Sequence, residues 1–407
     1  MNTVKRFNMS NEERFAILVD SEGLPLTYPN LYSIIHLRNP GYTINTIVAV
    51  LEDIELLYLF LDKFEIDIEE RFKNKECLKI NEIEGIVNLT NFKRDYFFSQ
   101  KSSKKILSFP KKLKKESIRA KILIKDDCVS KELIYRRLTN FAKYLEWLEL
   151  YLYPSCVSNT AKKFEARRPN LSTQESEEYK SFDQEQINII LQAVNPSNQQ
   201  SIWQSEYVKY RNELIVYMLL YLGCRKGELL NIKLTDFTNK NGISYVTIKR
   251  NHDDPNDTRL YQPLVKTRSR SLALNLNLKK KIDEYILKYR STVLSAELSD
   301  FLILSNQGHP LSINALNKIF YQISEKVSFN VHAHAFRHTW NDKYTDKSLV
   351  LVASGKTTED KAENDRAYLM GWIPGSQSVR RYSKRAEDRR AMEVGMEIQE
   401  KFEENNG

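Results

Sequence analysis

The chain has 407 residues, of which 41% are apolar, and a formal net charge of +9. This apolar share is enough for packed cores and excludes an intrinsically disordered chain. No apolar run approaches the ~18 residues of a membrane-spanning helix, and the first residues lack the apolar stretch of a secretory signal. We therefore expect a cytoplasmic protein of two or three domains, whose basic charge is compatible with a nucleic-acid partner without requiring one.

The four cysteines, Cys77, Cys128, Cys156 and Cys224, are too few for a disulfide framework. They form no Cys-x-x-Cys pair of the kind that builds a zinc ribbon. We expect buried, reduced thiols and no metal site.

The first half of the chain has mainly helical patterns. A short strand is expected at 13–20, and apolar residues recur at helical spacing from Thr43, the expected N-cap. Short helices follow at about 67–74 and 81–93, and a strongly amphipathic helix at 131–152. We expect a helical domain at 43–165, preceded by an N-terminal arm or small extension at 1–42.

A basic stretch at 99–125 interrupts this domain, with ten Lys or Arg residues against one Glu. It is too charged for a core element, so we interpret it as a connector. Its lysines either contact phosphates or form a merely solvated surface. The candidate phosphate contacts are Lys104, Lys105, Lys111, Lys112, Lys114 and Lys115.

A polar, Pro-containing segment at 166–181 predicts an interdomain linker, so that the second domain is 182–407. That domain has helical patterns at 183–194 and 205–224, then strand-like alternation at 243–249, 259–264 and 270–274. The remainder is mostly helical, with one short apolar strand at 301–304. The predicted fold class is mainly α with a small antiparallel β-sheet, the second domain being mixed α/β.

Four segments of the second domain carry residues suited to phosphate chemistry: LGCRKGELLNIKLTDF (222–237), LVKTRSRSLAL (264–274), HAHAFRHTW (332–340) and LMGWIPGSQSVRRYSKR (369–385). No Gly-rich phosphate loop and no Gly-x-Ser-x-Gly elbow is present, which disfavours ATP-driven and hydrolase functions. In order, the segments resemble the motifs of the tyrosine recombinase (phage integrase) family. The matching residues are Gly223, Arg225, Glu228, Lys266, His334, Arg337, His338, Gly371, Trp372 and Tyr382.

The resemblance covers about 182–390 well and implies a DNA strand-exchange enzyme. It implies a helical core-binding domain at 43–165 and a catalytic domain that cuts DNA through a 3′-phosphotyrosyl intermediate. The implied site consists of Arg225, Lys266, His334, Arg337, Trp372 and Tyr382, supported by Glu228 and His338. One departure is the long interval between Arg337 and Tyr382, where 347–365 has the pattern of an inserted loop.

The chemistry of these residue types agrees with that role. Two guanidiniums can each hold non-bridging phosphate oxygens bidentately, so Arg225 and Arg337 form a clamp where negative charge develops. The phenol of Tyr382 needs a base, and His334 titrates near neutrality. Lys266 is the candidate acid for the departing 5′ oxygen. A separate residue, Trp372, can donate its indole N–H to the phosphate.

Each residue also has a plainer interpretation. Arg225 alone could be a surface cation near a helix end. His334 and His338 stand at i and i+4, a spacing that could bind zinc, although no third ligand is evident. Lys249 and Arg268 compete with Lys266 for the role of acid. We interpret Glu228 as orienting Arg225, and His338 as structural support.

The resemblance further implies double-stranded DNA as partner, a homotetramer on DNA, no cofactor and no metal, in the bacterial cytoplasm and nucleoid. The tail at 386–407 predicts a helix that docks on a neighbouring protomer or on its own domain. Two other functions stay open. One is a type IB topoisomerase with the same chemistry, and the other a non-catalytic DNA-binding protein or repressor. Integration or excision of a mobile element is the expected role.

Overall fold

The computed structural model describes residues 2–10, 13–99, 128–156, 159–171, 181–250, 254–375, 391–392 and 394–402. The chain divides into two compact units, Met1–Ser176 and Glu177–Gly407. Their boundary falls within 166–181, the range assigned above to the linker. None of the helices in the described ranges is both long enough and apolar enough to span a membrane.

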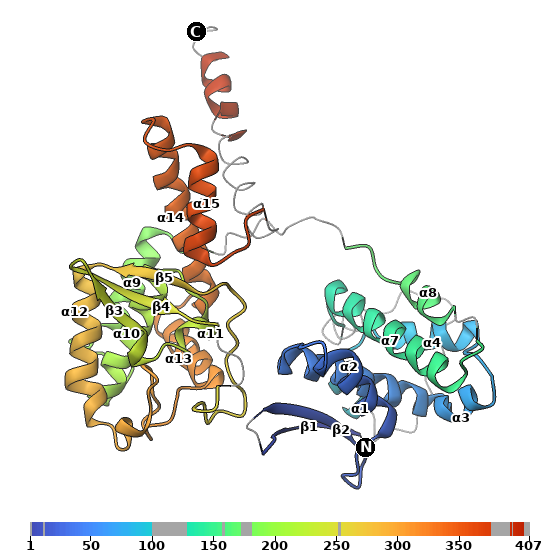
Figure 1. Ribbon diagram of the computed structural model, residues 1–407. Helices are drawn as coiled ribbons and strands as arrows, with labels where there is room; N and C mark the ends of the chain where they lie inside the picture. The colour runs from blue at the N-terminus through green and yellow to red at the C-terminus, as the bar shows by residue number, and fades with distance from the viewer. Residues whose placement is uncertain are drawn as a thin grey trace. The chain divides into compact units, whose positions relative to one another are not determined.

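The N-terminal unit combines a two-stranded hairpin with a bundle of helices (Figure 1). Strands β1 (Thr3–Asn8) and β2 (Arg14–Val19) pair antiparallel, with Thr3 opposite Val19. The strand and helices expected from sequence are confirmed to within a few residues. The helical elements are α1 (Thr27–Ser33), a π-helical turn (Ile34–Arg38), α2 (Ile44–Lys63), α3 (Ile68–Lys73), α4 (Ile80–Leu89), α5 (Arg94–Ser99), α7 (Lys131–Leu152) and α8 (Thr160–Glu165).

The hairpin and α1 share one core with the helices that follow. Phe15 of β2 and Tyr32 of α1 are buried in the same cluster as Leu51 of α2 and Phe141 of α7. The sequence analysis set 1–42 apart as an N-terminal arm or small extension. In the structure they cover the helices and belong to the same unit. The basic connector lies almost entirely outside the described residues, since 100–127 are not among them.

The C-terminal unit has a three-stranded antiparallel sheet packed among helices (Figure 1). Its first helix is capped by Asp183, whose carboxylate accepts from the Gln186 N–H at 2.7 Å. The principal elements are α9 (Gln184–Val194), α10 (Glu206–Leu222), α11 (Lys226–Leu229), β3 (Phe237–Lys240), β4 (Ile243–Ile248), β5 (Arg270–Leu274), α12 (Leu276–Glu284), α13 (Ile313–Val327), α14 (Ala333–Ala353) and α15 (Glu359–Met370).

Two expected strands are wrong. Residues 259–264 form a loop, and the strand that completes the sheet is β3. Arg259 holds this loop by donating to the carbonyls of Leu230 (3.1 Å) and Leu311 (2.8 Å), so a buried side chain replaces a strand ladder. Residues 301–304 make only isolated bridges, one of them to Pro310, which has no N–H to extend a ladder.

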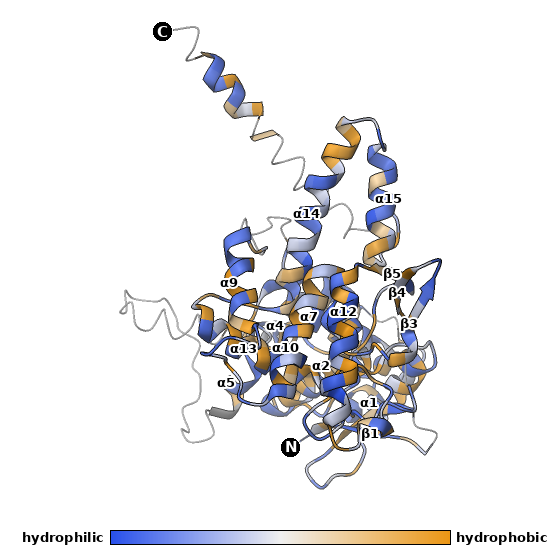
Figure 2. Ribbon diagram, turned by 90° about the vertical axis from the view of Figure 1, so that its left-hand side faces the viewer, coloured by the Kyte–Doolittle hydropathy of each residue, from blue (hydrophilic) through white to orange (hydrophobic). Residues whose placement is uncertain are grey.

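Helices α14 and α15 form an antiparallel pair that extends beyond the rest of this unit (Figure 1). The stretch 347–365, expected to be an inserted loop, is therefore mostly helical: it comprises the end of α14, a short turn and half of α15. The apolar end of α14 is orange in Figure 2, and Val350 there is exposed. The sequence did not predict this helical pair, because the many charged residues of α15 leave it with almost no apolar period.

Candidate active site

The site begins at the turn after α10. Gly223 ends this helix in the left-handed region (φ +57°), where a Cβ atom would lie 2.7 Å from the Trp340 ring. Arg225 then stands at the N-cap position of α11, and its backbone N–H donates to the Glu228 carboxylate at 3.0 Å. Burial raises the pKa of the intervening Cys224 thiol to about 12, so this thiol stays protonated and is no candidate nucleophile.

Glu228 is fully buried beneath this turn, and its carboxylate contacts three other side chains. Its carboxylate accepts from the Thr267 hydroxyl at 2.6 Å and from the Arg270 guanidinium at 2.8 Å, and it pairs with Arg225 at 3.4 Å. Burial by itself raises the pKa of Glu228, but the charges of Arg270 and Arg337 outweigh burial and hold that pKa below its ordinary value. Glu228 is thus an ionised support that orients Arg225.

Arg337 lies in the first turns of α14 and is 1% exposed. Its guanidinium donates to the Gly223 carbonyl at 2.7 Å and to the Met370 carbonyl at 2.9 Å. It also lies over the Trp372 ring, 5.3 Å from the ring centroid. One side chain therefore ties together the turn that precedes Arg225, the end of α15 and the Gly-Trp element.

The histidines of α14 occupy three different environments. His332 is the N-cap, and its ring nitrogen Nδ1 accepts from the Ala335 N–H at 3.2 Å. Two residues on, His334 is exposed and packs edge-to-face on the buried His338, with ring centroids 4.5 Å apart. This arrangement gives His334 access to a ligand, while His338 supports it from below.

Arg225 and His334 line one pocket of about 1040 Å³. Its walls come from the start of α11, one side of α13 and the segment 328–334. Two residues that lie more than a hundred positions apart in the sequence therefore meet at one opening.

Lys266 is exposed and lies in the loop before β5, between the segments 259–264 and 270–274 that the sequence analysis expected to be strands. The loop is nevertheless fixed beside the site, because the Arg268 N–H donates to the Gly371 carbonyl at 3.0 Å. The competing Lys249 forms an ion pair with Asp236 at 2.7 Å. Trp372 is buried under Arg337, whereas Tyr382 lies outside the described residues.

Sequence reasoning missed two residues of this site, Thr267 and Arg270. Both are buried and donate to Glu228, and Arg270 also donates to the Leu369 carbonyl at 2.6 Å. A signal was present: Arg270 is in phase with the inward-facing Leu272 and Leu274 of β5. A charged residue on the buried face of a strand indicates a buried ionic partner.

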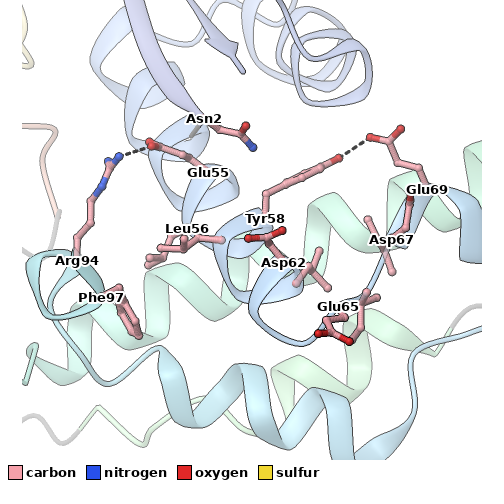
Figure 3. A pocket seen from close by; sticks show the side chains of 14 residues that line it. Asn2, Glu55, Leu56, Tyr58, Asp62, Glu65, Asp67, Glu69, Arg94 and Phe97 are labelled. Atoms are coloured by element: carbon pink, nitrogen blue, oxygen red, sulfur yellow. Dashed lines mark hydrogen bonds and ion pairs between the residues drawn. The ribbon is translucent and has the colours of Figure 1, made fainter. Parts of the chain in front are cut away.

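A second hollow, of about 800 Å³, lies in the N-terminal unit and is acidic (Figure 3). Arg94 forms an ion pair with Glu55, and the Tyr58 hydroxyl donates to Glu69 at 2.9 Å. Because carboxylates repel DNA phosphates, this hollow is not a phosphate-binding groove. Its acidic lining is Glu55, Asp62, Glu65, Asp67 and Glu69.

Residues 180–351 match the model of the phage integrase family. The chain carries a phage integrase domain. Its enzyme class is that of the tyrosine-type site-specific recombinases. The match includes Arg225, Lys266, His334 and Arg337 and ends before Trp372 and Tyr382. No curated protein matches the chain.

Solved structures similar to this chain include two integrases and a site-specific recombinase. The Tn1549 transposon integrase in complex with transposon right end DNA is 15% identical, with a TM-score of 0.50 over 90% of this chain and 99% of that one. The lambda integrase (residues 75–356) bound to DNA is 13% identical, with a TM-score of 0.48 over 86% and 93%. The XerH recombinase bound to palindromic difH substrate, in a post-cleavage complex, is 18% identical, with a TM-score of 0.42 over 80% and 86%. At 15% identity, the likeness to the Tn1549 transposon integrase shows a shared fold alone.

Proposed function

We propose that this integrase cuts and rejoins DNA strands at specific sites through a 3′-phosphotyrosyl intermediate, in the integration or excision of a mobile element. The observation that carries the proposal is the position of the two arginines. Arg337 is held on the Gly223 carbonyl, two residues before Arg225, and Arg225 opens into the same pocket as His334. Arg337 is thus anchored to the turn that presents Arg225, and two guanidiniums positioned by one turn suit a phosphodiester, whose charge increases in the transition state.

The proposed reaction needs one nucleophile, one base and one acid. The Tyr382 phenol attacks phosphorus while His334 accepts its proton, and the bond to the 5′ oxygen breaks as Lys266 protonates that oxygen. The DNA is then joined to Tyr382 through its 3′ phosphate. A 5′ hydroxyl from another strand reverses these steps, and since the phosphotyrosyl bond retains the energy of the phosphodiester, rejoining requires no ATP.

Double-stranded DNA is the proposed partner, bound by a homotetramer. The transposon DNA in the complex of Tn1549 integrase supports this partner, and the transposon source of that integrase supports a mobile-element role. The six lysines from Lys104 to Lys115 lie outside the described residues and stay candidates for phosphate contacts. The last described helical residues, 391–392 and 394–402, expose Met392, Met396 and Phe402, which agrees with a tail that docks on a neighbouring protomer.

Covalent trapping tests the proposal and identifies the target site in the same experiment. The full chain is produced in cells that carry its gene with the flanking genomic DNA, and DNA that remains attached after denaturation is sequenced. Nicked duplexes of the recovered sequence are then used in vitro. We expect covalent complexes from the wild type and none from Tyr382→Phe, while the control Tyr368→Phe, an exposed tyrosine of α15, traps DNA normally.

The outcomes separate the competing functions. Trapping by Tyr382→Phe would show that another residue is the nucleophile. Binding without any covalent complex would favour a repressor. Relaxation of supercoiled DNA at many unrelated sequences, without exchange between two duplexes, would favour a topoisomerase.

A further inference from the structure

The cysteines of the N-terminal unit are not buried as the sequence analysis expected. Cys77 is exposed, Cys128 and Cys156 are partly exposed, and among the four only Cys224 is buried. Cys77 lies between α3 and α4, and Cys156 lies between α7 and α8. The two thiols meet although 79 positions separate them in the sequence, because both loops converge on the carboxyl end of α7.

Glu149 joins the two thiols. Its carboxylate and the two sulfur atoms all lie within 4.8 Å of one another. The residue is fully buried in the last turn of α7, where one oxygen faces Cys156 Sγ at 3.6 Å and the other accepts from the Thr160 hydroxyl at 2.7 Å. The Thr160 bond fixes the orientation of the carboxylate, as outer partners do for ligands in metal sites.

We propose that Cys77, Glu149 and Cys156 bind a thiophilic divalent cation of the Zn²⁺ class. Two thiolates and one carboxylate supply three of the four tetrahedral positions of zinc, and a water molecule supplies the fourth. Zinc–sulfur bonds of about 2.3 Å place two sulfurs roughly 3.8 Å apart, so the spacing between the two sulfurs, at most 4.8 Å, needs to close by no more than about 1 Å. Small changes of rotamer at the exposed Cys77 provide that movement.

The electrostatics of the cluster favour a cation. Glu149 supplies a buried carboxylate to the cluster, and a bound divalent ion deprotonates coordinating thiols outright. The cluster also lies at the carboxyl end of a long helix, where the helix dipole attracts positive charge.

A disulfide between Cys77 and Cys156 is the competing chemistry. Its formation would remove both thiol donors from a fully buried carboxylate, whereas a metal ion would use the carboxylate as a ligand. The metal site therefore accounts for all three residues, and the disulfide accounts for two. Bound zinc would link the loop after α3 to the last turn of α7 and to the α7–α8 connection, and would stabilise this part of the N-terminal unit.

Metal titration of the full chain tests the site. The reduced protein is stripped with a chelator and titrated with Zn²⁺ against a chromophoric competitor, then with Co²⁺, whose sulfur-to-metal charge-transfer band reports thiolate ligands specifically. We expect one tight equivalent per chain, a thiolate charge-transfer band and a higher Tm with zinc. The cobalt band distinguishes this cluster from binding to His334 and His338.

The variants Cys77→Ser and Cys156→Ser are expected to lose at least a hundredfold in zinc affinity, together with the cobalt band and the rise in Tm. The matched control is Cys128→Ser, a partly exposed thiol outside the cluster that should bind as the wild type does. Because Cys77 is exposed, its variant should fold, so the test does not depend on a Glu149 variant. Wild-type protein that binds no zinc, Ser variants that bind it normally, or a mass loss of two hydrogens in air with no metal uptake would each overturn the proposal.

Discussion

Arg337 donates to the carbonyl of Gly223 at 2.7 Å, across 114 positions of the sequence. This bond joins the start of α14 to the turn that presents Arg225. A guanidinium can hold the Gly223 and Met370 carbonyls at once because its N–H groups diverge in a fixed plane. The position of one proposed clamp residue thus depends directly on the other.

Replacing Arg337 by Lys tests this dependence. A single ammonium cannot span both carbonyls, so we expect Arg337→Lys to reduce covalent trapping of DNA by a hundredfold or more, as for removal of one transition-state donor. Loss of buried hydrogen bonds should also lower the free energy of unfolding by about 1–3 kcal/mol. Single-turnover cleavage and urea denaturation measure the two effects.

The matched control is Arg290→Lys. Arg290 is likewise buried and donates to main-chain carbonyls, those of Ala296, Ser299 and Phe301, in the same unit. It should lose a similar amount of stability and keep its cleavage rate. Equal loss of cleavage in both variants would mean that Arg337 acts through folding alone.

Glu228 gives a prediction for pH dependence. Its folded-state pKa is depressed, so its contribution to stability is fully present above the ordinary value of 4.5 and is lost as pH falls through the lower folded value. Glu228→Gln leaves Arg270 without its buried counter-ion, and we expect a loss of about 3–5 kcal/mol at neutral pH. The variant should also lose part of the wild-type acid sensitivity below pH 4.5.

Urea unfolding at neutral and acidic pH, followed by tryptophan fluorescence, measures this effect. Trp203, Trp340 and Trp372 lie in the C-terminal unit and Trp147 lies in the other, so the signal reports mainly on the unit of interest. A Gln variant with the same stability as the wild type at both pH values would contradict the role assigned to the ionised carboxylate.

Substitution of Gly371 tests how the loop that carries Lys266 packs beside Trp372. A Cβ atom at Gly371 would lie 2.7 Å from the Arg270 guanidinium, 2.8 Å from Thr267 and 3.0 Å from the Arg268 carbonyl. Gly371→Ala should therefore push this loop away, lower the stability by about 2–4 kcal/mol and slow cleavage. Gly355→Ala shares the positive φ (+69° against +64°) but meets nothing within 4 Å.

The control Gly355→Ala should lower the free energy of unfolding by only about 1 kcal/mol, the cost of placing alanine at a positive φ, and should leave cleavage unchanged. The difference between the two alanine variants, measured by thermal unfolding and single-turnover cleavage, isolates the clash. If both variants behave alike, the packing of the loop on Gly371 has no influence on the site.

Local signals made much of the fold predictable. The period of α7 (Lys131–Leu152) and the capping box at Asp183 are properties of short segments, and both helices are confirmed. The errors arise where a side chain from elsewhere decides the structure. Arg259 turns a strand-like pattern at 259–264 into a loop by reaching carbonyls of distant segments, which no local period reveals.

In the candidate site, too, some residues could be predicted from local sequence patterns and others depend on the tertiary structure. Motif order predicts Arg225, His334 and Arg337. In the structure Arg225 and His334 line one pocket, and Arg337 donates to the Gly223 carbonyl two residues before Arg225. The support by Thr267 and Arg270 could not follow from motif order, because it depends on which face of β5 is buried. The position of Tyr382 lies outside the described residues and stays a prediction.

Lys266 is the proposed acid for the leaving 5′ oxygen, and substrate chemistry can test that role. Lys266→Ala should slow cleavage of an ordinary phosphodiester by a factor of about 10²–10⁴, the usual contribution of a general acid. A substrate with sulfur in place of the bridging 5′ oxygen should restore the rate, because a thiol of pKa near 8.5 leaves without protonation. Lys249→Ala, which removes the cation paired with Asp236, should cleave both substrates normally. If sulfur instead rescues the Lys249 variant, or fails to rescue the Lys266 variant, the acid lies elsewhere.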